Sequence, residues 1–229
     1  MSCILAIETS TEVCSVALFQ DGMTLFEKEI HEPQAHTQYL AAITEEAVSF
    51  ANSHAIPLDA VAVSSGPGSY TGLRIGVSTA KGVCYGFGIP LISIPTLKLL
   101  CVKPLLYDEL EENALLCPMI DARRMDVYSA VYDRALKLIR EPQAETIDQD
   151  SYASILDQNI VYFFGTGANK CKEVITHPNA RFIDQVEPLA RHIMPLAEQA
   201  IARNDFADVA YFEPFYLKEF VATKAKSLF

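Results

Sequence analysis

The sequence predicts an α/β fold made of two similar lobes. Short apolar segments that fit strands alternate with longer segments of helical spacing, which is typical of a sheet with helices packed on it. The order of these segments, β-β-β-α-β-α, occurs twice along the 229 residues. In each copy a glycine-containing loop, at Gly66 and at Gly165, follows the fourth strand. A duplication of this kind predicts two lobes with a cleft between them.

The first copy is expected to form an N-terminal lobe over residues 1–100. The polar segment from Gln20 to Gly22 separates two apolar segments and indicates a β-hairpin. Leu40, Ile43 and Ala47 recur at helical spacing and predict a helix after the third strand. The expected strands are residues 3–8, 13–19, 24–30, 60–64 and 90–94, and the expected helices are residues 35–51 and 71–86.

The second copy is expected to form a C-terminal lobe over residues 101–229, with the boundary between 96 and 113. Its expected strands are residues 115–121, 126–132, 136–139 and 160–164. A short helix is expected at 151–158 and another after the loop at 165–170. Amphipathic segments after Leu189 and at 209–220 predict C-terminal helices, and the last of them can pack back on the N-terminal lobe. This arrangement resembles the ASKHA fold of actin, Hsp70 and sugar kinases, which is ribonuclease-H-like.

Composition excludes several classes of protein. Asp and Glu outnumber Lys and Arg by 29 to 18, so the net charge is −11, whereas a protein that holds nucleic acid alone needs a basic surface. If the chain acts on RNA, another protein must hold that RNA. No apolar segment reaches membrane-spanning length, and the N-terminus lacks the basic region of a signal peptide, so a cytoplasmic protein is expected. The six cysteines form no C-x-x-C pair and are expected to be reduced and buried, without a metal site.

The most informative segment is SSGPGSYTGLRIGVSTAKG, residues 64–82. Its glycines lie between a buried strand and a helix, where tight turns and close backbone approach need them. Small residues then recur every fourth position at Gly72, Gly76, Ala80 and Cys84. Such a ridge allows another helix to pack at close range, and packing on the chain's own sheet is the alternative.

Three motifs together resemble the TsaB family, also called YeaZ. They are AIETST near the N-terminus, the block at 64–82, and DARRMDVY at 121–128, and the resemblance extends to FYLKEF at 215–220. It implies a subunit that pairs with its paralogue TsaD, which carries the metal and the transfer chemistry, together with the ATPase TsaE. The implied product is threonylcarbamoyladenosine beside the anticodon of tRNA, with tRNA reached only through the complex.

The resemblance also implies an interface made by the two helices of the first lobe. The interface residues expected from it are His36, Tyr39, Leu40, Ile43 and Ala47 on the first helix, and Gly72, Leu73, Gly76, Val77, Ala80 and Cys84 on the second. On this hypothesis a bulky residue at Gly76 or Ala80 abolishes pairing and leaves the isolated chain folded. A homodimer through the same helices is an alternative.

Catalytic and metal-binding patterns are missing from the sequence. In TsaD a glycine loop of this kind is followed by H-x-x-x-H, whereas residues 89–106 contain no histidine, so no metal site is expected. The sequence contains no G-x-S-x-G elbow, the motif that would indicate a hydrolase or peptidase. The predicted role is therefore that of a non-catalytic subunit.

Weak nucleotide binding between the lobes remains open as a second hypothesis, with a small-molecule kinase or ATPase as the rival function. The residues that it uses lie at strand ends and in the second glycine loop: Glu8, Thr9, Ser10, Asp121, Gly165 and Gly167. Their alternative role is to shape tight connections. Arg123 and Arg124, in the turn between two strands, can pair with phosphate, with acids of a partner, or with water.

Overall fold

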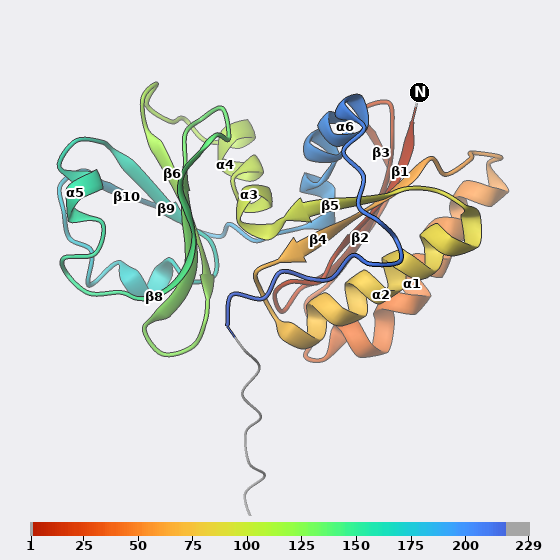
Figure 1. Ribbon diagram of the computed structural model, residues 1–229, viewed down its shortest axis with the longest axis horizontal. Helices are drawn as coiled ribbons and strands as arrows, with labels where there is room; N and C mark the ends of the chain where they lie inside the picture. The colour runs from red at the N-terminus through yellow and green to blue at the C-terminus, as the bar shows by residue number, and fades with distance from the viewer. Residues whose placement is uncertain (1, 219–229) are drawn as a thin grey trace, which may run out of the picture.

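A computed structural model describes residues 2–218 and shows two five-stranded mixed sheets, one in each half of the chain (Figure 1). The first sheet has the order β3-β2-β1-β4-β5, and the second has the equivalent order β8-β7-β6-β9-β10. In each sheet the first three strands are antiparallel, and the remaining strands are parallel to the first strand of that half. The predicted fold class, a duplicated two-lobed α/β fold of the ASKHA type, is confirmed.

The strands of the first sheet are close to those expected from the sequence. They are β1 (Cys3–Glu8), β2 (Cys14–Gln20), β3 (Met23–Ile30), β4 (Ala60–Gly66) and β5 (Leu91–Pro95). The two helices between them are α1 (Ala35–Ser53) and α2 (Tyr70–Phe87). Ser69 caps α2, because its side chain accepts a hydrogen bond from the N–H of Gly72 at 3.2 Å.

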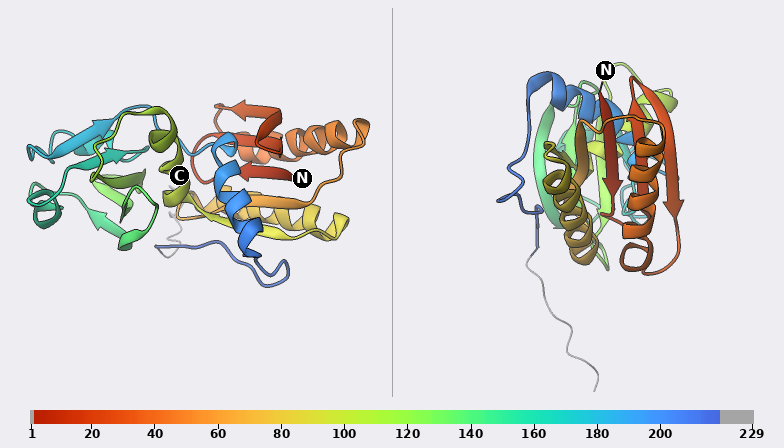
Figure 2. Two further views of the ribbon diagram at one scale, coloured as in Figure 1. Left: turned by 90° about the horizontal axis from the view of Figure 1, so that it is seen from above. Right: turned by 90° about the vertical axis from the view of Figure 1, so that its right-hand side faces the viewer.

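Both faces of the first sheet are covered, which explains why β1 is buried at every position. On one face Leu5 and Ile7 pack with α1 and α2, which run side by side across the sheet (Figures 1 and 2). On the other face Ile4 and Ala6 pack with α6 (Met194–Arg203) and with the 3₁₀ helix η2 (Ala190–His192). The helix expected after Leu189 is therefore α6, and it lies on the first sheet.

The second lobe repeats the sheet but has fewer helices. Its strands are β6 (Leu115–Asp121), β7 (Asp126–Tyr132), β8 (Leu138–Thr146), β9 (Val161–Phe164) and β10 (Ala180–Ile183). Two short helices, α3 (Thr96–Leu100) and α4 (Val102–Tyr107), form most of the connection between the two sheets (Figure 2). Because α3 contacts both β4 and β6, it joins the two sheets.

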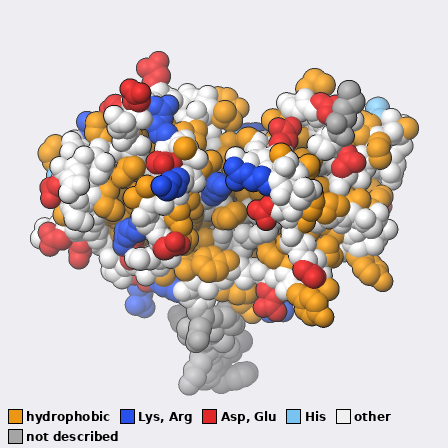
Figure 3. Space-filling model, turned by 45° about the horizontal axis from the view of Figure 1, so that its top comes forward, with side chains coloured by type: hydrophobic (Ala, Val, Ile, Leu, Met, Phe, Trp, Pro, Cys, Tyr) orange, Lys and Arg blue, Asp and Glu red, His pale blue; other side chains and the backbone are white. Residues whose placement is uncertain are grey.

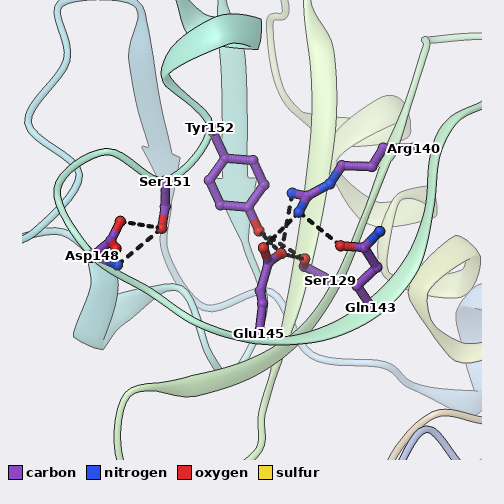
Figure 4. A network of polar contacts seen from close by, with 7 residues as sticks. All are labelled: Ser129, Arg140, Gln143, Glu145, Asp148, Ser151 and Tyr152. Carbon is purple, nitrogen blue, oxygen red and sulfur yellow. Dashed lines mark hydrogen bonds and ion pairs between the residues drawn. The ribbon is translucent and has the colours of Figure 1, made fainter.

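A polar network stabilises the side of the second sheet that carries α5 (Ala153–Leu156) (Figure 4). The Glu145 carboxylate accepts hydrogen bonds from the hydroxyls of Ser129 and Tyr152, both at 2.5 Å. Arg140 forms an ion pair with the same carboxylate at 2.7 Å and lies over the Tyr152 ring. Since Ser129 and Tyr152 are buried, this network satisfies polar groups that would otherwise be costly to bury.

Several expectations for the second half were wrong. The third strand, expected at 136–139, runs instead over Leu138–Thr146. The helix expected after the loop at 165–170 is only the 3₁₀ helix η1 (Asn169–Cys171), and β10, which was not expected, follows it. The helix expected at 209–220 is absent over 209–218, and its last two positions lie outside the described residues.

The segment after α6 runs back along the first lobe instead of forming that helix. Ala207 pairs with Leu91 at the edge of the sheet, and Lys81 donates hydrogen bonds to the carbonyls of Ala210 and Phe212. The N–H of Phe215 then donates to the carbonyl of Ser65 at 2.7 Å. These contacts hold the segment beside the first glycine loop. In the part of the chain described, no helix is long and apolar enough to cross a membrane.

Candidate functional site

The first glycine loop and the start of α2 pack directly on the turn between β1 and β2. The N–H of Ser69 donates to the carbonyl of Ser10 at 2.7 Å. A side chain at Gly68 would collide with Ser10, and one at Gly72 with the Thr9 carbonyl oxygen. At Gly76 the added atom would collide with the Thr9 hydroxyl. These glycines are therefore needed for the contact between α2 and its own sheet.

This packing changes the predicted partner interface. Nine of the predicted residues are buried inside the chain: Leu40, Ile43, Ala47, Gly72, Leu73, Gly76, Val77, Ala80 and Cys84. His36 and Tyr39 are half-buried, with His36 Nε2 3.2 Å from the Val13 carbonyl and the Tyr39 hydroxyl bonded to Glu32. The small ridge thus packs on the chain's own sheet. A partner that bound these helices would therefore contact their outer faces and not the buried residues expected from the sequence.

The outer face of α2 carries a second row of small residues that the sequence reasoning missed. Ser78, Gly82 and Gly86 are exposed and lie four residues apart, so they align along the helix. A Cβ added at Gly82 or Gly86 would have no neighbour within 4 Å in the part of the chain that the structure describes. Tyr85, 88% exposed, lies beside this row. The row was detectable in the sequence, but spacing alone did not tell which of the two rows faces outward.

The outer face of α1 continues this surface. Its exposed side chains include Gln38, Ala41, Ala42 and Glu45. Because α1 and α2 contact each other on one face of the sheet, their outer sides form a continuous two-helix surface (Figures 1 and 2). We call these exposed residues of α1 together with Ser78, Gly82, Tyr85 and Gly86 the outer helix face.

Glu8 is fully buried at the end of β1. Its carboxylate accepts hydrogen bonds from the N–H and the hydroxyl of Ser10, each at 2.5 Å. Burial raises the pKa of Glu8 to about 7, against the opposing effect of the Ser10 hydrogen bonds. Thr9 and Ser10 are buried with it. In this arrangement the three residues stabilise the turn between β1 and β2. That is the role expected of them if they shape a tight connection and do not bind a nucleotide.

The equivalent residues of the second lobe also contact their own chain. Asp121 pairs with Lys170 at 2.5 Å and accepts a hydrogen bond from the N–H of Arg123 at 2.8 Å. The N–H of Gly167 donates to the Met119 carbonyl at 2.9 Å, and a side chain at Gly165 would collide with the same carbonyl. The Gly167 N–H, a donor that a nucleotide phosphate would need, is thus used within the fold, and the geometry of this loop does not favour the nucleotide hypothesis.

A cavity of about 200 Å³ lies between the lobes, and none of the six predicted nucleotide residues lines it. Its lining is mainly apolar and consists of Ser65, Gly66, Pro67, Pro95, Leu97, Tyr132, Pro142 and Phe215. Figure 3 shows a notch between the two lobes, with acidic and basic side chains interspersed on the face drawn. The structure does not bring the predicted nucleotide residues together at this cavity.

The cysteine side chains and His192 are buried within the fold. All six cysteines are buried as free thiols, as expected. His192 is buried, and burial lowers its pKa to about 4, with Arg191 and Lys103 acting in the same direction. Within residues 2–218, no cluster of three or more His, Cys, Asp or Glu side chains is arranged to hold a metal ion.

The turn between β6 and β7 has an uncommon backbone. Arg123 and Arg124 have φ values of 71° and 48°, the left-handed region in which non-glycine residues cost roughly 1–2 kcal/mol each. The N–H of Asp126 donates to the Arg123 carbonyl, which closes the turn. Turns with two positive φ values favour Asn-Gly. The backbone conformation at both positions therefore disfavours arginine, yet two exposed arginines occupy them.

Comparison with known proteins places the chain in a family. A family model described as "TsaD: tRNA N6-adenosine threonylcarbamoyltransferase" matches residues 27–226. The chain is 30% identical over 236 residues to the tRNA threonylcarbamoyladenosine biosynthesis protein TsaB of Escherichia coli (strain K12), covering 96% of each chain. It is 28% identical to TsaB of Haemophilus influenzae, covering 96% of this chain and 95% of the relative.

A solved structure gives the same result. YeaZ from Pseudomonas aeruginosa superimposes with a TM-score of 0.80 at 26% identity, covering 95% of this chain and 100% of that chain. Agreement in sequence and in fold extends over nearly the whole length of both proteins. The chain therefore belongs to the TsaB family, also called YeaZ, and it also matches the TsaD family model.

Proposed function

We propose that the chain acts in the biosynthesis of threonylcarbamoyladenosine in tRNA, as a non-catalytic subunit that binds a TsaD protein. Its relatives carry the name of that pathway. In this proposal the N-terminal lobe supplies the binding surface, and TsaE joins the pair. Transfer chemistry and the main hold on tRNA belong to the partner, as the acidic net charge of −11 favours.

The outer helix face is the observation that carries this proposal. It combines small residues, which permit close approach of another helix, with the exposed ring of Tyr85, a residue type enriched in protein interfaces. Gly82 and Gly86 each cost roughly 1 kcal/mol in helix stability relative to alanine. No contact within residues 2–218 requires them, because a Cβ at either position meets none of these residues within 4 Å. Docking of a partner helix against this row explains why glycine occupies both positions.

Gly82→Trp is expected to weaken pairing with TsaD about a hundredfold, or roughly 2.8 kcal/mol, since the indole would hold the two helix surfaces apart. The isolated variant stays folded because the added side chain points into open space. Pairing is measured by calorimetric titration with purified TsaD, and folding by circular dichroism. Gly82→Ala is the matched control and is expected to pair within a few-fold of the wild type.

Unchanged affinity for TsaD in the tryptophan variant would show that this face is not the interface. Light scattering of each variant alone tests the homodimer. If Gly82→Trp converts a dimer to a monomer and has no effect on TsaD binding, the face serves self-association instead.

Depletion of the chain in its host is expected to lower threonylcarbamoyladenosine in bulk tRNA, because a subunit required for the complex limits the reaction. Nucleoside analysis of digested tRNA by mass spectrometry measures it. Restoring the wild-type gene should return the modification, whereas the Gly82→Trp gene should not. Unchanged modification after depletion would contradict the assigned pathway.

A further inference from the structure

The two arginines of the turn between β6 and β7 are not neutralised by the acids beside them. Asp121 is paired with Lys170 at 2.5 Å, and Asp126 with Lys218 at 2.6 Å. The hydrogen bond from Lys218 holds the pKa of Asp126 below its ordinary value, so that this acid stays ionised and paired. Within residues 2–218, neither Arg123 nor Arg124 has an ion pair. The turn therefore presents two uncompensated positive charges on a chain whose net charge is −11.

The C-terminal segment leads from this turn to an aromatic surface on the first lobe. Two residues before Lys218, the Tyr216 ring lies 4.9 Å from the ring of Tyr70. Arg74 donates to the Tyr70 hydroxyl at 2.8 Å and also lies over that ring. Tyr216 and Arg74 are exposed. Cations next to exposed aromatic rings are typical of surfaces that bind nucleic acid, in which the rings stack on bases.

We propose that the turn at Arg123 and Arg124 binds phosphate groups of RNA. Guanidinium groups bind phosphate oxygens in pairs of hydrogen bonds, and the turn, which the bond from the Asp126 N–H to the Arg123 carbonyl closes, carries two such groups on successive residues. The neighbouring aromatic surface favours nucleic acid over an acidic protein segment, which needs no stacking faces. The choice of RNA over DNA rests on the proposed function. This contact adds to the partner's hold on RNA and does not replace it.

The backbone strain at the turn supplies a test that separates binding from folding. Arg123→Asn/Arg124→Gly places residues suited to positive φ at both positions, so it should raise Tm by roughly 2–4 °C. The same variant removes both charges and should raise the Kd for RNA about tenfold or more. Arg123→Gln/Arg124→Gln should weaken RNA binding equally without raising Tm. A purely structural turn would gain stability and leave RNA binding unchanged.

Binding is measured by titrating the isotope-labelled full chain with a short RNA stem–loop at low salt and following backbone amide signals by NMR, a method that detects weak complexes. The matched control is Arg134→Gln/Lys137→Gln, which removes two exposed charges from the next turn along the chain, at the opposite end of β7. It should change the Kd by about twofold or less, because its effect is only on net charge.

Three results would overturn the proposal. One is the absence of RNA-induced shifts at 121–126, and another is an equal loss of affinity in the control variant. The third is tighter binding of poly-glutamate or of a DNA stem–loop than of RNA, which would assign the arginines to an acidic protein or to DNA. Since no TsaD protein is present, failure of the pairing proposal leaves this measurement unaffected.

Discussion

Gly72→Ala is expected to destabilise the folded chain by about 2–3 kcal/mol, whereas Gly82→Ala on the same helix is expected to stabilise it by about 0.5–1 kcal/mol. Gly72 lies against the backbone carbonyl of Thr9, so a single methyl group forces α2 away from the sheet. At Gly82 the methyl group meets open space, and only the gain in helix propensity remains. The opposite signs follow from which side of α2 each glycine occupies.

Urea unfolding followed by circular dichroism measures both effects, with the midpoint shift at constant m taken as the change in stability. Both variants add the same methyl group to the same helix, so differences in propensity cancel in their comparison. A Gly72→Ala midpoint equal to that of the wild type would mean that α2 does not approach the β1–β2 turn as closely as the structure shows.

The same contact corrects the expectation for Gly76→Trp and for bulky residues at Ala80. From the sequence these changes were expected to break pairing and leave the chain folded. Gly76 faces the Thr9 hydroxyl, and Ala80, also on α2, is fully buried in the core that covers this face of the first sheet. Large side chains there are expected to disrupt the fold itself. Spacing of four identified the small row correctly as a packing ridge, but helical periodicity cannot decide which neighbour the ridge meets.

The strands of the first lobe were predictable because their apolar character is local. β1 and β4 are buried on both faces, so every position except Glu8 at the end of β1 is apolar or small, and the pattern is visible without a partner strand. β10 was missed because it is a four-residue edge strand, half-buried throughout, in which Ala180 and Arg181 resemble a loop. Its existence depends on pairing with β9, a contact that no local pattern encodes.

The surroundings of the predicted nucleotide residues were harder to predict than the fold. The sequence placed Glu8 at a strand end, where an acid can meet a ligand or a turn. Its burial results from the glycine loop about sixty residues later, whose Ser69 bonds to Ser10 and closes the site. Asp121, the equivalent residue, remains exposed because its own loop provides Lys170 instead. These long-range contacts give Glu8 and Asp121 different surroundings, although the two residues hold equivalent places in the order of elements.

The pH dependence of stability should reveal the buried Glu8 carboxyl. Its pKa is raised to about 7 by burial, above the ordinary value of 4.5. The folded chain therefore binds more protons than the unfolded chain between those values, and this contribution to stability is full below pH 4.5 and is lost as pH rises through 7. The loss amounts to about 3 kcal/mol, because each pKa unit corresponds to about 1.4 kcal/mol.

Titration of His192 changes the stability in the opposite direction and masks part of the effect of Glu8. Burial lowers its pKa to about 4, so its contribution is full above pH 6.5 and is lost as pH falls through 4. Between pH 4.5 and 6.5 the two slopes oppose each other, and the wild-type stability should change little from these two groups. Above pH 6.5 only the Glu8 contribution still changes, so stability should fall there.

Glu8→Gln is expected to remove the decline above pH 6.5 and to expose the rise due to His192 below it. The glutamine retains an oxygen that accepts the hydrogen bonds from Ser10, and it carries no charge to bury. Urea unfolding of wild type and variant from pH 4 to 8.5 gives the difference in stability. That difference should move by about 3 kcal/mol in favour of the variant as pH rises, because ionisation of Glu8 in its buried site is costly only in the wild type. A difference that is constant across the range would show that Glu8 titrates as an ordinary carboxyl, and that the turn between β1 and β2 is open to water.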